Sequence, residues 1–256
     1  MPAWEKAMAQ AVVLEGCVSV RAALEAGRRP LYEIYVHREA HGRDLAQVGA
    51  LAARRGVRVL RVNDEELARL ARGRLHGGIV ALAGTRGYDD LDNLTGARGD
   101  PFVVMLDGLE DPYNFGHAVR ALYAAGVDGV VIRLREWSGA EGTILRASAG
   151  AFDRLPIARV ANPAEAAEAL RARGLLVACA AEEPRAVSIY DAAVAPPCLL
   201  VIGGERRGIS REMVRQADLL VRIPYGSQFR HSLGLTAAAS ILAFEVTRRR
   251  GARETG

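Results

Sequence analysis

From residue 101 onward, short and almost wholly apolar runs alternate with stretches of helical periodicity. This alternation constrains the fold more than any other feature of the sequence. The clearest apolar runs are PFVVMLDGL (101–109), GVVIRL (129–134), LLVACAA (175–181), PCLLVIGGE (197–205) and LLVRIPY (219–225). Strands that are apolar throughout are typical of a parallel sheet with helices on both faces. We therefore expect an α/β domain over residues 101–256.

Residues 1–88 show a second, shorter pattern of strands and helices. Strands are expected at 31–37, 57–62 and 76–84, and helices at 21–27, 43–56 and 63–71. Residues 89–100 contain turn residues and acids without an apolar period, which indicates a linker. The predicted organisation is a small α/β domain at 1–88, a linker at 89–100 and a larger α/β domain at 101–256.

Composition places the chain among ordinary globular proteins. Half of its 256 residues are hydrophobic and a quarter are charged. No apolar run approaches the roughly 20 residues of a membrane span, and the first residues do not resemble a secretory signal. Cys17, Cys179 and Cys198 are odd in number and widely spaced, which indicates free thiols rather than disulfides. We expect a cytoplasmic protein with no membrane association and no metal, since the five histidines lack zinc-site spacing.

The charge is concentrated near the N-terminus. Residues 1–88 carry 14 Lys and Arg against 9 Asp and Glu, whereas residues 89–256 carry 20 against 21. A basic N-terminal module is suited to phosphate contacts and hence to a nucleic acid. The alternative is a general preference for Arg, which accounts for all but one of the basic residues.

Ligands of parallel sheets bind at the carboxyl ends of strands, so the loops after residues 109, 203 and 224 are the candidates for a functional site. In the first loop, Asn114 is expected to cap a helix, and Arg120 follows on that helix. In the second, Gly203 and Gly204 precede Glu205, so that main-chain groups can lie close to a ligand. Neither a GxGxxG fingerprint nor a P-loop is present.

The third loop runs from Ile223 and Pro224 to a helix expected at 232–250. Ser232 is predicted to be its N-cap, and Leu233 to begin its apolar face. Gly234 would then lie within the first turn, where Gly costs about 1 kcal/mol relative to Ala in a helix interior.

Taken in order, the three loops resemble the motifs of the SpoU (TrmH-like) RNA 2′-O-methyltransferases. The family's N-x-G-x-x-x-R matches Asn114, Gly116 and Arg120, and its G-x-E-x-x-G matches Gly203, Glu205 and Gly208. Its third motif, I-P…S-L-N-x-S, matches Ile223, Pro224, Ser232 and Leu233. The resemblance covers about 101–250, and LEGCVSVRAALEAGRRPLYEIYVH and HGGIVALAG resemble the family's substrate-binding domain.

This resemblance implies a SPOUT-type fold, in which the C-terminal segment forms a deep trefoil knot, and a homodimer. It also implies S-adenosylmethionine as methyl donor, bound by Gly203, Gly204, Ile223, Pro224 and Leu233. The catalytic residues would be Arg120, Asn114, Glu205 and Ser232. The substrate would be RNA, and ribosomal RNA is favoured because the family's rRNA enzymes carry a separate N-terminal domain.

The family assigns removal of the ribose hydroxyl proton to the arginine of its first motif. The pKa of a guanidinium exceeds about 12, so Arg120 is an awkward general base. Two interpretations remain open. Arg120 is neutral because it is desolvated beside the positive sulfonium, or it holds the target phosphate and positions the hydroxyl while water takes the proton.

The sequence departs from the family at Gly234, where the family usually has Asn, and at Thr236, where it often has Ser. Thr keeps the hydroxyl, but Gly has no amide. Either the amide is dispensable, or Gln228 or His231 replaces it, or the domain binds donor or RNA without catalysis. The leading hypothesis is thus an RNA ribose methyltransferase. The alternative is a non-catalytic RNA-binding or ribosome-assembly factor on the same scaffold.

Overall fold

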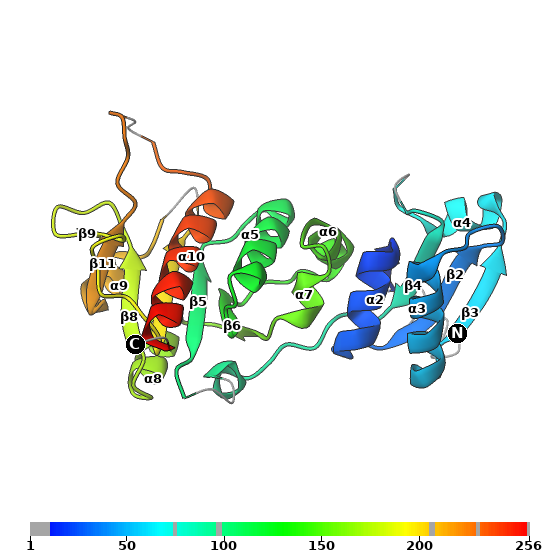
Figure 1. Cartoon of the computed structure of the whole chain (residues 1–256), viewed down its shortest axis with the longest axis horizontal. Coiled ribbons are helices and arrows are strands. Elements are labelled where there is room, and N and C mark those ends of the chain that lie inside the picture. Colours follow the sequence, from blue (N-terminus) through cyan, green and yellow to red (C-terminus); the bar gives the residue numbers. More distant parts are fainter. Residues whose placement is uncertain (1–10, 74–75, 96–98, 205–207, 229–230, 255–256) are drawn as a thin grey trace. The chain divides into compact units, whose positions relative to one another are not determined.

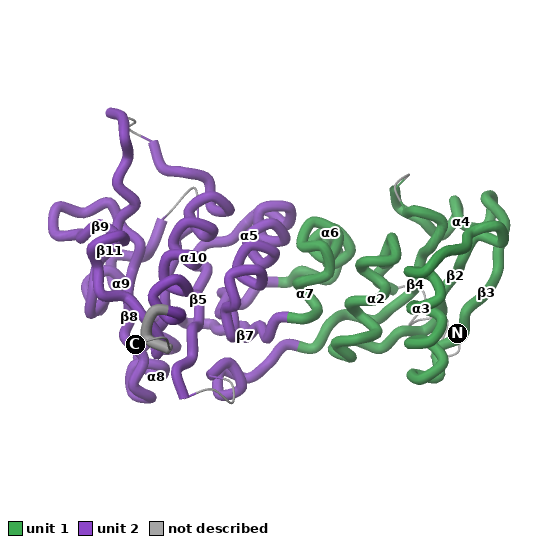
Figure 2. The backbone as a smooth tube through the Cα atoms, viewed as in Figure 1, with its two compact units in different colours: residues 1–87, 136–154 green, residues 88–135, 155–256 purple. Residues whose placement is uncertain are grey.

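The computed structural model of the chain describes residues 11–73, 76–95, 99–204, 208–228 and 231–254. The chain forms two compact units, coloured separately in Figure 2. Unit 1 comprises Met1–Gly87 and Glu136–Arg154, and unit 2 comprises Tyr88–Arg135 and Leu155–Gly256. The predicted boundaries at 88 and 101 stay a prediction.

Unit 1 is built on a four-stranded mixed sheet in the order β1-β4-β2-β3. β4 is antiparallel to both β1 and β2, whereas β2 and β3 are parallel. The elements are β1 (Val12–Glu15), α2 (Cys17–Ala26), β2 (Leu31–His37), α3 (Arg43–Arg55), β3 (Arg58–Val62), α4 (Asp64–Leu70) and β4 (Ile79–Ala83). Asn63 caps α4 in a reciprocal capping box with Glu66, as its position before the helix predicts. Leu67 of α4 is buried with Val62 and Val80 of the sheet.

The second part of unit 1 is an excursion that connects two strands of unit 2. It contains η2 (Ser138–Ala140), α6 (Glu141–Ala147) and α7 (Ala151–Arg154). Helix α6 packs against β1, and α7 packs against α2. Figure 2 shows these helices in the colour of the N-terminal segment.

A buried ionic cluster joins the excursion to the N-terminal segment. The fully buried Arg29 guanidinium donates two hydrogen bonds to Asp153, at 2.8 and 2.7 Å, and one to Glu141 at 2.7 Å. The main-chain N–H of Arg86 donates to the same Glu141 carboxylate at 3.0 Å. Burial raises the pKa of Glu141, although Arg29 opposes the shift. Burial alone would lower the pKa of Arg29, but its hydrogen bonds and charge contacts with the two acids raise it.

Unit 2 is built on a seven-stranded sheet in the order β7-β6-β5-β10-β8-β11-β9. Every neighbouring pair of strands is parallel, which confirms the expected parallel sheet. The strands are β5 (Phe102–Asp107), β6 (Gly129–Arg133), β7 (Ile157–Val160), β8 (Leu176–Ala180), β9 (Val187–Ser188), β10 (Cys198–Gly203) and β11 (Leu219–Arg222). The helices are η1 (Leu91–Thr95), α5 (Pro112–Ala124), α8 (Pro163–Arg171), α9 (Arg211–Gln216) and α10 (Leu235–Glu254).

Helices cover both faces of this sheet, as expected. Side chains of a strand alternate between the faces. On one face, Val103 and Met105 of β5 share a core with α8, α9 and η1. On the other, α10 packs against α5 and β10, and Figure 1 shows α5 and α10 side by side across the strands. Leu94 of η1 is fully buried against Gly129, so the segment predicted as a linker contributes to the core. The trefoil knot stays a prediction.

Two predicted helix caps are wrong. Helix α5 is capped by Asp111, whose carboxylate accepts the main-chain N–H of Asn114 at 2.7 Å, and Pro112 follows at the first helical position. Asn114 therefore lies inside the first turn. Helix α10 begins at Leu235 instead of at 232, and the Gly234 carbonyl accepts the Ala238 N–H at 3.1 Å. Gly234, and not Ser232, thus occupies the N-cap position.

A hydrogen bond to the preceding loop lies just before the start of α10. The main-chain N–H of Leu233 donates to the Tyr225 hydroxyl at 3.0 Å. Gly is tolerated at an N-cap, where it costs only a few tenths of a kcal/mol relative to Asn. The expected penalty of about 1 kcal/mol for Gly234 applies to helix interiors and is therefore wrong here.

None of the described helices is long and apolar enough to cross a membrane. Within the described residues, no group of three or more His, Cys, Asp and Glu side chains is placed to hold a metal ion. Cys17, Cys179 and Cys198 are free thiols, and burial raises the pKa of Cys179 to about 12.

Candidate active site

Two cavities lie in unit 2 where its parallel strands end, at the edge where the sheet rule places ligands. The first, here called the β5 cavity, has a volume of about 520 Å³. It is lined by Gly108, Leu109, Glu110, Asp111, Asn114, Arg135, Gly204 and Leu235. The second, the β11 cavity, has a volume of about 370 Å³ and collects residues from the ends of β8, β10 and β11 and the start of α10. Both volumes fall within the usual range for small-molecule sites.

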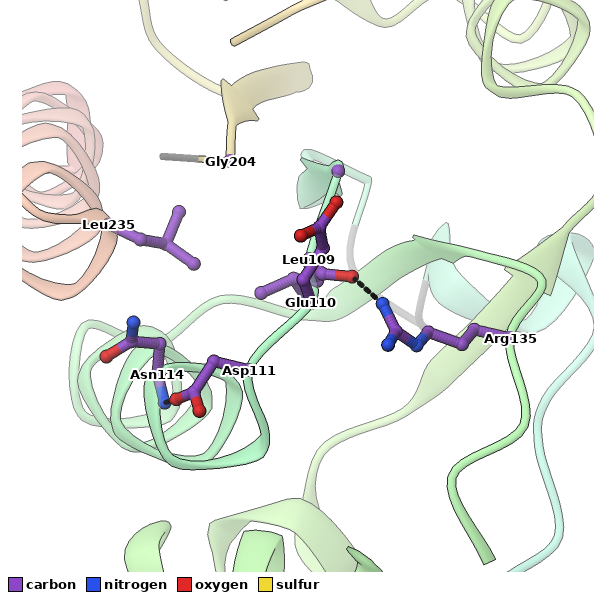
Figure 3. Close-up of a pocket in the computed structure, with 8 residues that line it drawn as sticks. Leu109, Glu110, Asp111, Asn114, Arg135, Gly204 and Leu235 are labelled. Carbon is purple, nitrogen blue, oxygen red and sulfur yellow. Dashed lines mark hydrogen bonds between the residues drawn. The ribbon is translucent and has the colours of Figure 1, made fainter. Parts of the chain in front are cut away.

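The loop after β5 is fixed by two arginines from the end of the neighbouring strand β6. Arg135 donates to the main-chain carbonyl of Leu109 at 3.1 Å, the bond drawn in Figure 3. Arg133 donates to the carboxylate of the buried Asp107 at 3.1 Å. These bonds and the Asp111 cap set where α5 begins, and so set the position of Asn114 in the cavity wall.

The glycine pair at the end of β10 is required by the packing of the backbone. The Gly204 N–H donates to the Asp107 carbonyl at 2.6 Å, and the Gly204 carbonyl accepts the Gly208 N–H at 3.0 Å. A Cβ atom on Gly203 would lie 2.4 Å from the Gly208 carbonyl carbon, and one on Gly204 would lie 2.2 Å from the Gly108 oxygen. Contact with a ligand was the reason expected for these glycines from the sequence. The structure adds a second reason, which is the close contact within the loop after β10 and between it and the loop after β5.

Gly204→Ala is therefore expected to destabilise the protein by about 1–3 kcal/mol, because the backbone of Gly108 or of Gly204 must shift. Gly226→Ala is the matched control, since a Cβ atom there meets nothing within 4 Å. It should change the free energy of unfolding by no more than about 0.5 kcal/mol. Urea unfolding of both variants checks this, and equal stabilities would contradict the packing argument.

The β11 cavity has an apolar wall and a polar rim. Ile202, Val221, Ile223, Leu233 and Leu242 supply apolar surface. Tyr225 and Leu233, joined by the hydrogen bond described above, both line the cavity, so this contact shapes its mouth. The charged groups in its described lining are Glu182, Glu183 and Arg222.

Gly204 and Leu235 line both cavities. Figure 3 shows the Leu235 side chain extending from α10 toward the loop after β5. Molecules in the two cavities would therefore be separated by one thin wall. The arrangement suits a transfer between two bound molecules, because such a reaction needs its partners in contact and in fixed orientation.

The structure brings most of the predicted site residues to these cavities. Asn114 lines the β5 cavity, and Ser232 lines the β11 cavity with four of the five predicted donor-binding residues: Gly203, Gly204, Ile223 and Leu233. Pro224 is not among the described lining residues, and neither are Gln228 and His231. Glu205 lies outside the described residues.

Arg120 does not line either cavity. It lies on α5 six residues after Asn114, so the two side chains leave the helix about 120° apart. Arg120 is exposed, on the same stripe of the helix as Tyr113 and His117. The two polar residues of the first motif are thus not brought together in one cavity of a single chain.

Several lining residues were missed by the sequence analysis, notably Glu182, Glu183 and Arg135. They follow β8 and β6, whose ends were not among the three loops considered. The sheet order places β8 between β10 and β11, so its end necessarily joins the same site. Applying the rule for carboxyl ends to every strand would have found them.

Comparison with known proteins gives consistent matches over nearly the whole chain. The sequence model of the SpoU rRNA methylase family matches residues 101–244, and that of the RNA 2′-O ribose methyltransferase substrate-binding domain matches residues 13–88. The chain is 34% identical to a putative TrmH family tRNA/rRNA methyltransferase, YacO of Bacillus subtilis, over 87% of this chain and 90% of that protein.

The chain is also 31% identical to the 23S rRNA (guanosine-2′-O-)-methyltransferase RlmB of Xylella fastidiosa, over 92% of this chain and 95% of that protein. Among solved structures, the AdoMet-bound rRNA methyltransferase of Sinorhizobium meliloti superposes with a TM-score of 0.77 at 27% identity. That match covers 94% of this chain and 88% of the other.

Proposed function

The chain belongs to the SpoU rRNA methylase family, and from this premise we infer that it is an S-adenosylmethionine-dependent RNA 2′-O-methyltransferase. Ribosomal RNA is the proposed substrate class, because relatives that match over most of the chain are named as rRNA enzymes. We propose that residues 1–88 bind the RNA, in agreement with the match to the substrate-binding domain.

The observation that carries this proposal is the wall shared by the two cavities. The β11 cavity fits the methyl donor by its volume, its apolar surface and the main-chain groups of Gly203 and Gly204. When bound there, S-adenosylmethionine supplies an activated methyl group. The β5 cavity, with Asn114 in its wall, is then the proposed place of the target ribose. Gly204 and Leu235 separate the two sites by a single layer of residues.

The proposed roles of the polar residues combine the resemblance to the family with the positions of those that the structure describes. Asn114 orients the ribose from the wall of the β5 cavity, and Ser232 acts at the rim of the β11 cavity. Arg120 acts on the target hydroxyl or on its phosphate, and Glu205 orients neighbouring groups. Guanidinium groups in general are poor bases and good phosphate ligands, and this favours the phosphate-holding role.

Because Arg120 is exposed, it needs a second surface to complete a site. Tyr113 and Tyr123 of α5 and Phe244 of α10 are each about half exposed, and the two helices pack side by side. Such an aromatic surface is suited to an interface between subunits. We propose a homodimer that forms through α5 and α10 and encloses Arg120 at the interface.

The direct test is incubation of the purified protein with ribosomal RNA and methyl-labelled S-adenosylmethionine. The expected result is label at a single ribose. That ribose is identified because the phosphodiester bond next to a methylated 2′-oxygen resists alkaline hydrolysis. Label on a base would contradict the proposed chemistry. Binding of RNA without any label would favour the non-catalytic alternative.

Gly234→Asn restores the residue that the family usually has, and it tests that alternative separately. Both residues are good N-caps, so the free energy of unfolding should change by only a few tenths of a kcal/mol. We expect wild-type and variant to methylate RNA at rates within a small factor of each other, as measured by initial rates at saturating donor. An inactive wild-type and an active variant would mean that the missing amide had abolished catalysis.

A further inference from the structure

The charged groups of the β11 cavity form a pattern that the proposed function leaves unexplained. Glu182 and Glu183 follow the end of β8, and Arg222 is the last residue of β11. All three line the cavity. No side-chain hydrogen bond or ion pair joins any of them to another described residue. The described lining thus includes two acidic residues, both exposed, and one basic residue.

This pattern is complementary to S-adenosylmethionine, whose sulfonium and ammonium are positive and whose carboxylate is negative. The product, S-adenosylhomocysteine, keeps the ammonium and the carboxylate but has a neutral sulfur. On the basis of the proposed function, we propose that Glu182 and Glu183 make the β11 cavity selective for the charged donor over the demethylated product.

The remainder of the cavity offers little basis for that selection. Donor and product share the adenosine and the amino acid, so apolar contacts with Ile202, Val221 and Leu233 are nearly the same for both. They differ by one methyl group and one positive charge. A methyl group adds only a modest contact term, whereas the charge interacts with every carboxylate nearby. Selection by charge therefore falls to the two glutamates.

Arg222 has a different expected role. Its natural partner is the ligand carboxylate, which donor and product have in common. Arg222 should therefore contribute equally to the binding of both and should not discriminate between them.

The selectivity of Glu182 and Glu183 for the charged sulfur would also favour product release, because the ligand loses one attraction when its methyl group is transferred.

The test is calorimetric titration of the wild-type protein, Glu182→Gln, Glu183→Gln and the double variant. The ligands are S-adenosylmethionine, S-adenosylhomocysteine and sinefungin, which carries an ammonium group in place of the methylated sulfur. Each substitution should weaken donor and sinefungin binding by about two- to fivefold, since both glutamates are exposed to solvent. The affinity for S-adenosylhomocysteine should fall by a smaller factor, because the product keeps only the ammonium, and the preference for the donor should shrink at high salt.

Two control variants sharpen the result. Glu212→Gln removes a nearby exposed acid of α9 that does not line the cavity, and it should leave every affinity unchanged. Arg222→Gln should weaken donor and product equally, but not 5′-methylthioadenosine, which lacks the carboxylate.

Equal weakening of donor and product in the glutamate variants would overturn the inference, because the acids would then act on the shared part of the ligand or on the fold. Unchanged affinities would overturn it as well. If the wild-type protein bound neither donor nor product, the proposed function would fail together with the inference. If the protein binds both ligands and the glutamate substitutions leave the ratio of donor affinity to product affinity unchanged, the inference alone would be rejected.

Discussion

Arg120→Ala is expected to reduce methylation of ribosomal RNA by about 10²- to 10⁴-fold, the usual range for losing a group that assists proton transfer or holds the reacting hydroxyl in place. Because Arg120 is exposed on α5 and is outside the described lining of the β5 and β11 cavities, folding and donor binding should stay intact. Initial rates with saturating donor measure the first effect, and calorimetric titration of S-adenosylmethionine measures the second.

Arg211→Ala is a matched control for this experiment. Arg211 is an exposed arginine of α9 in the same unit, outside the described lining of both cavities. The Arg211→Ala variant should methylate ribosomal RNA at the wild-type rate. Full activity of Arg120→Ala would reject the role assigned to the first motif, and loss of donor binding would show that the substitution had damaged the fold.

A mixture of two inactive variants tests whether Arg120 acts across the proposed dimer. Arg120→Ala and Asn114→Ala are refolded together in equal amounts. Random pairing makes half of the dimers mixed. If Asn114 of one chain works with Arg120 of the other, each mixed dimer has one complete site. Roughly a quarter of the wild-type activity should then return. If both residues serve the same chain, no mixed dimer is active.

Arg29→Met is expected to destabilise the protein by about 3–5 kcal/mol, because it leaves the buried carboxylates of Glu141 and Asp153 without their cation. The midpoint of urea unfolding measures the loss. The destabilisation should shrink as the pH falls from neutrality toward about 4, because the uncompensated carboxylates of the folded variant take up protons at a higher pH than those of the unfolded chain.

Two further variants isolate the cause. Arg54→Met changes an exposed arginine of α3 in the same unit and should alter the free energy of unfolding by less than about 0.5 kcal/mol. Combining Arg29→Met with Asp153→Asn and Glu141→Gln should recover part of the lost stability, since no unpaired charge remains buried. A triple variant no more stable than Arg29→Met would mean that lost packing, and not charge, was the main effect.

Local signals were sufficient for most of the fold. The helix predicted at 43–56 ends where Gly56 adopts a left-handed backbone, and the strand predicted at 31–37 has those bounds in the structure. Apolar strands and short-range caps are encoded within a few residues, so they can be read without knowing the tertiary arrangement. The parallel sheet followed from the same patterns.

The errors arose where distant residues decide. Ser232 looks like an N-cap, but the helix begins three residues later, after Gly234. Asn114 and Asp111 are both good caps, and only the turn geometry selects Asp111. Glu182 follows β8, whose end was not among the three loops considered, and the sheet order places that end between those of β10 and β11. The site role of Arg120 was assigned by resemblance and stays a prediction; in the structure the residue is exposed on α5.

The excursion at residues 136–154 also limits how the two units can be exchanged between related proteins by recombination. The chain passes between its units at residues 87–88, 135–136 and 154–155, so no single recombination point separates them. An N-terminal segment taken from a relative and joined at residue 88 would pack against the original excursion. The arginine of that segment at position 29 would need acidic partners at positions 141 and 153. Exchange of RNA specificity between relatives by shuffling therefore requires a compatible excursion, and the lineage is expected to diversify by substitution within paired segments instead.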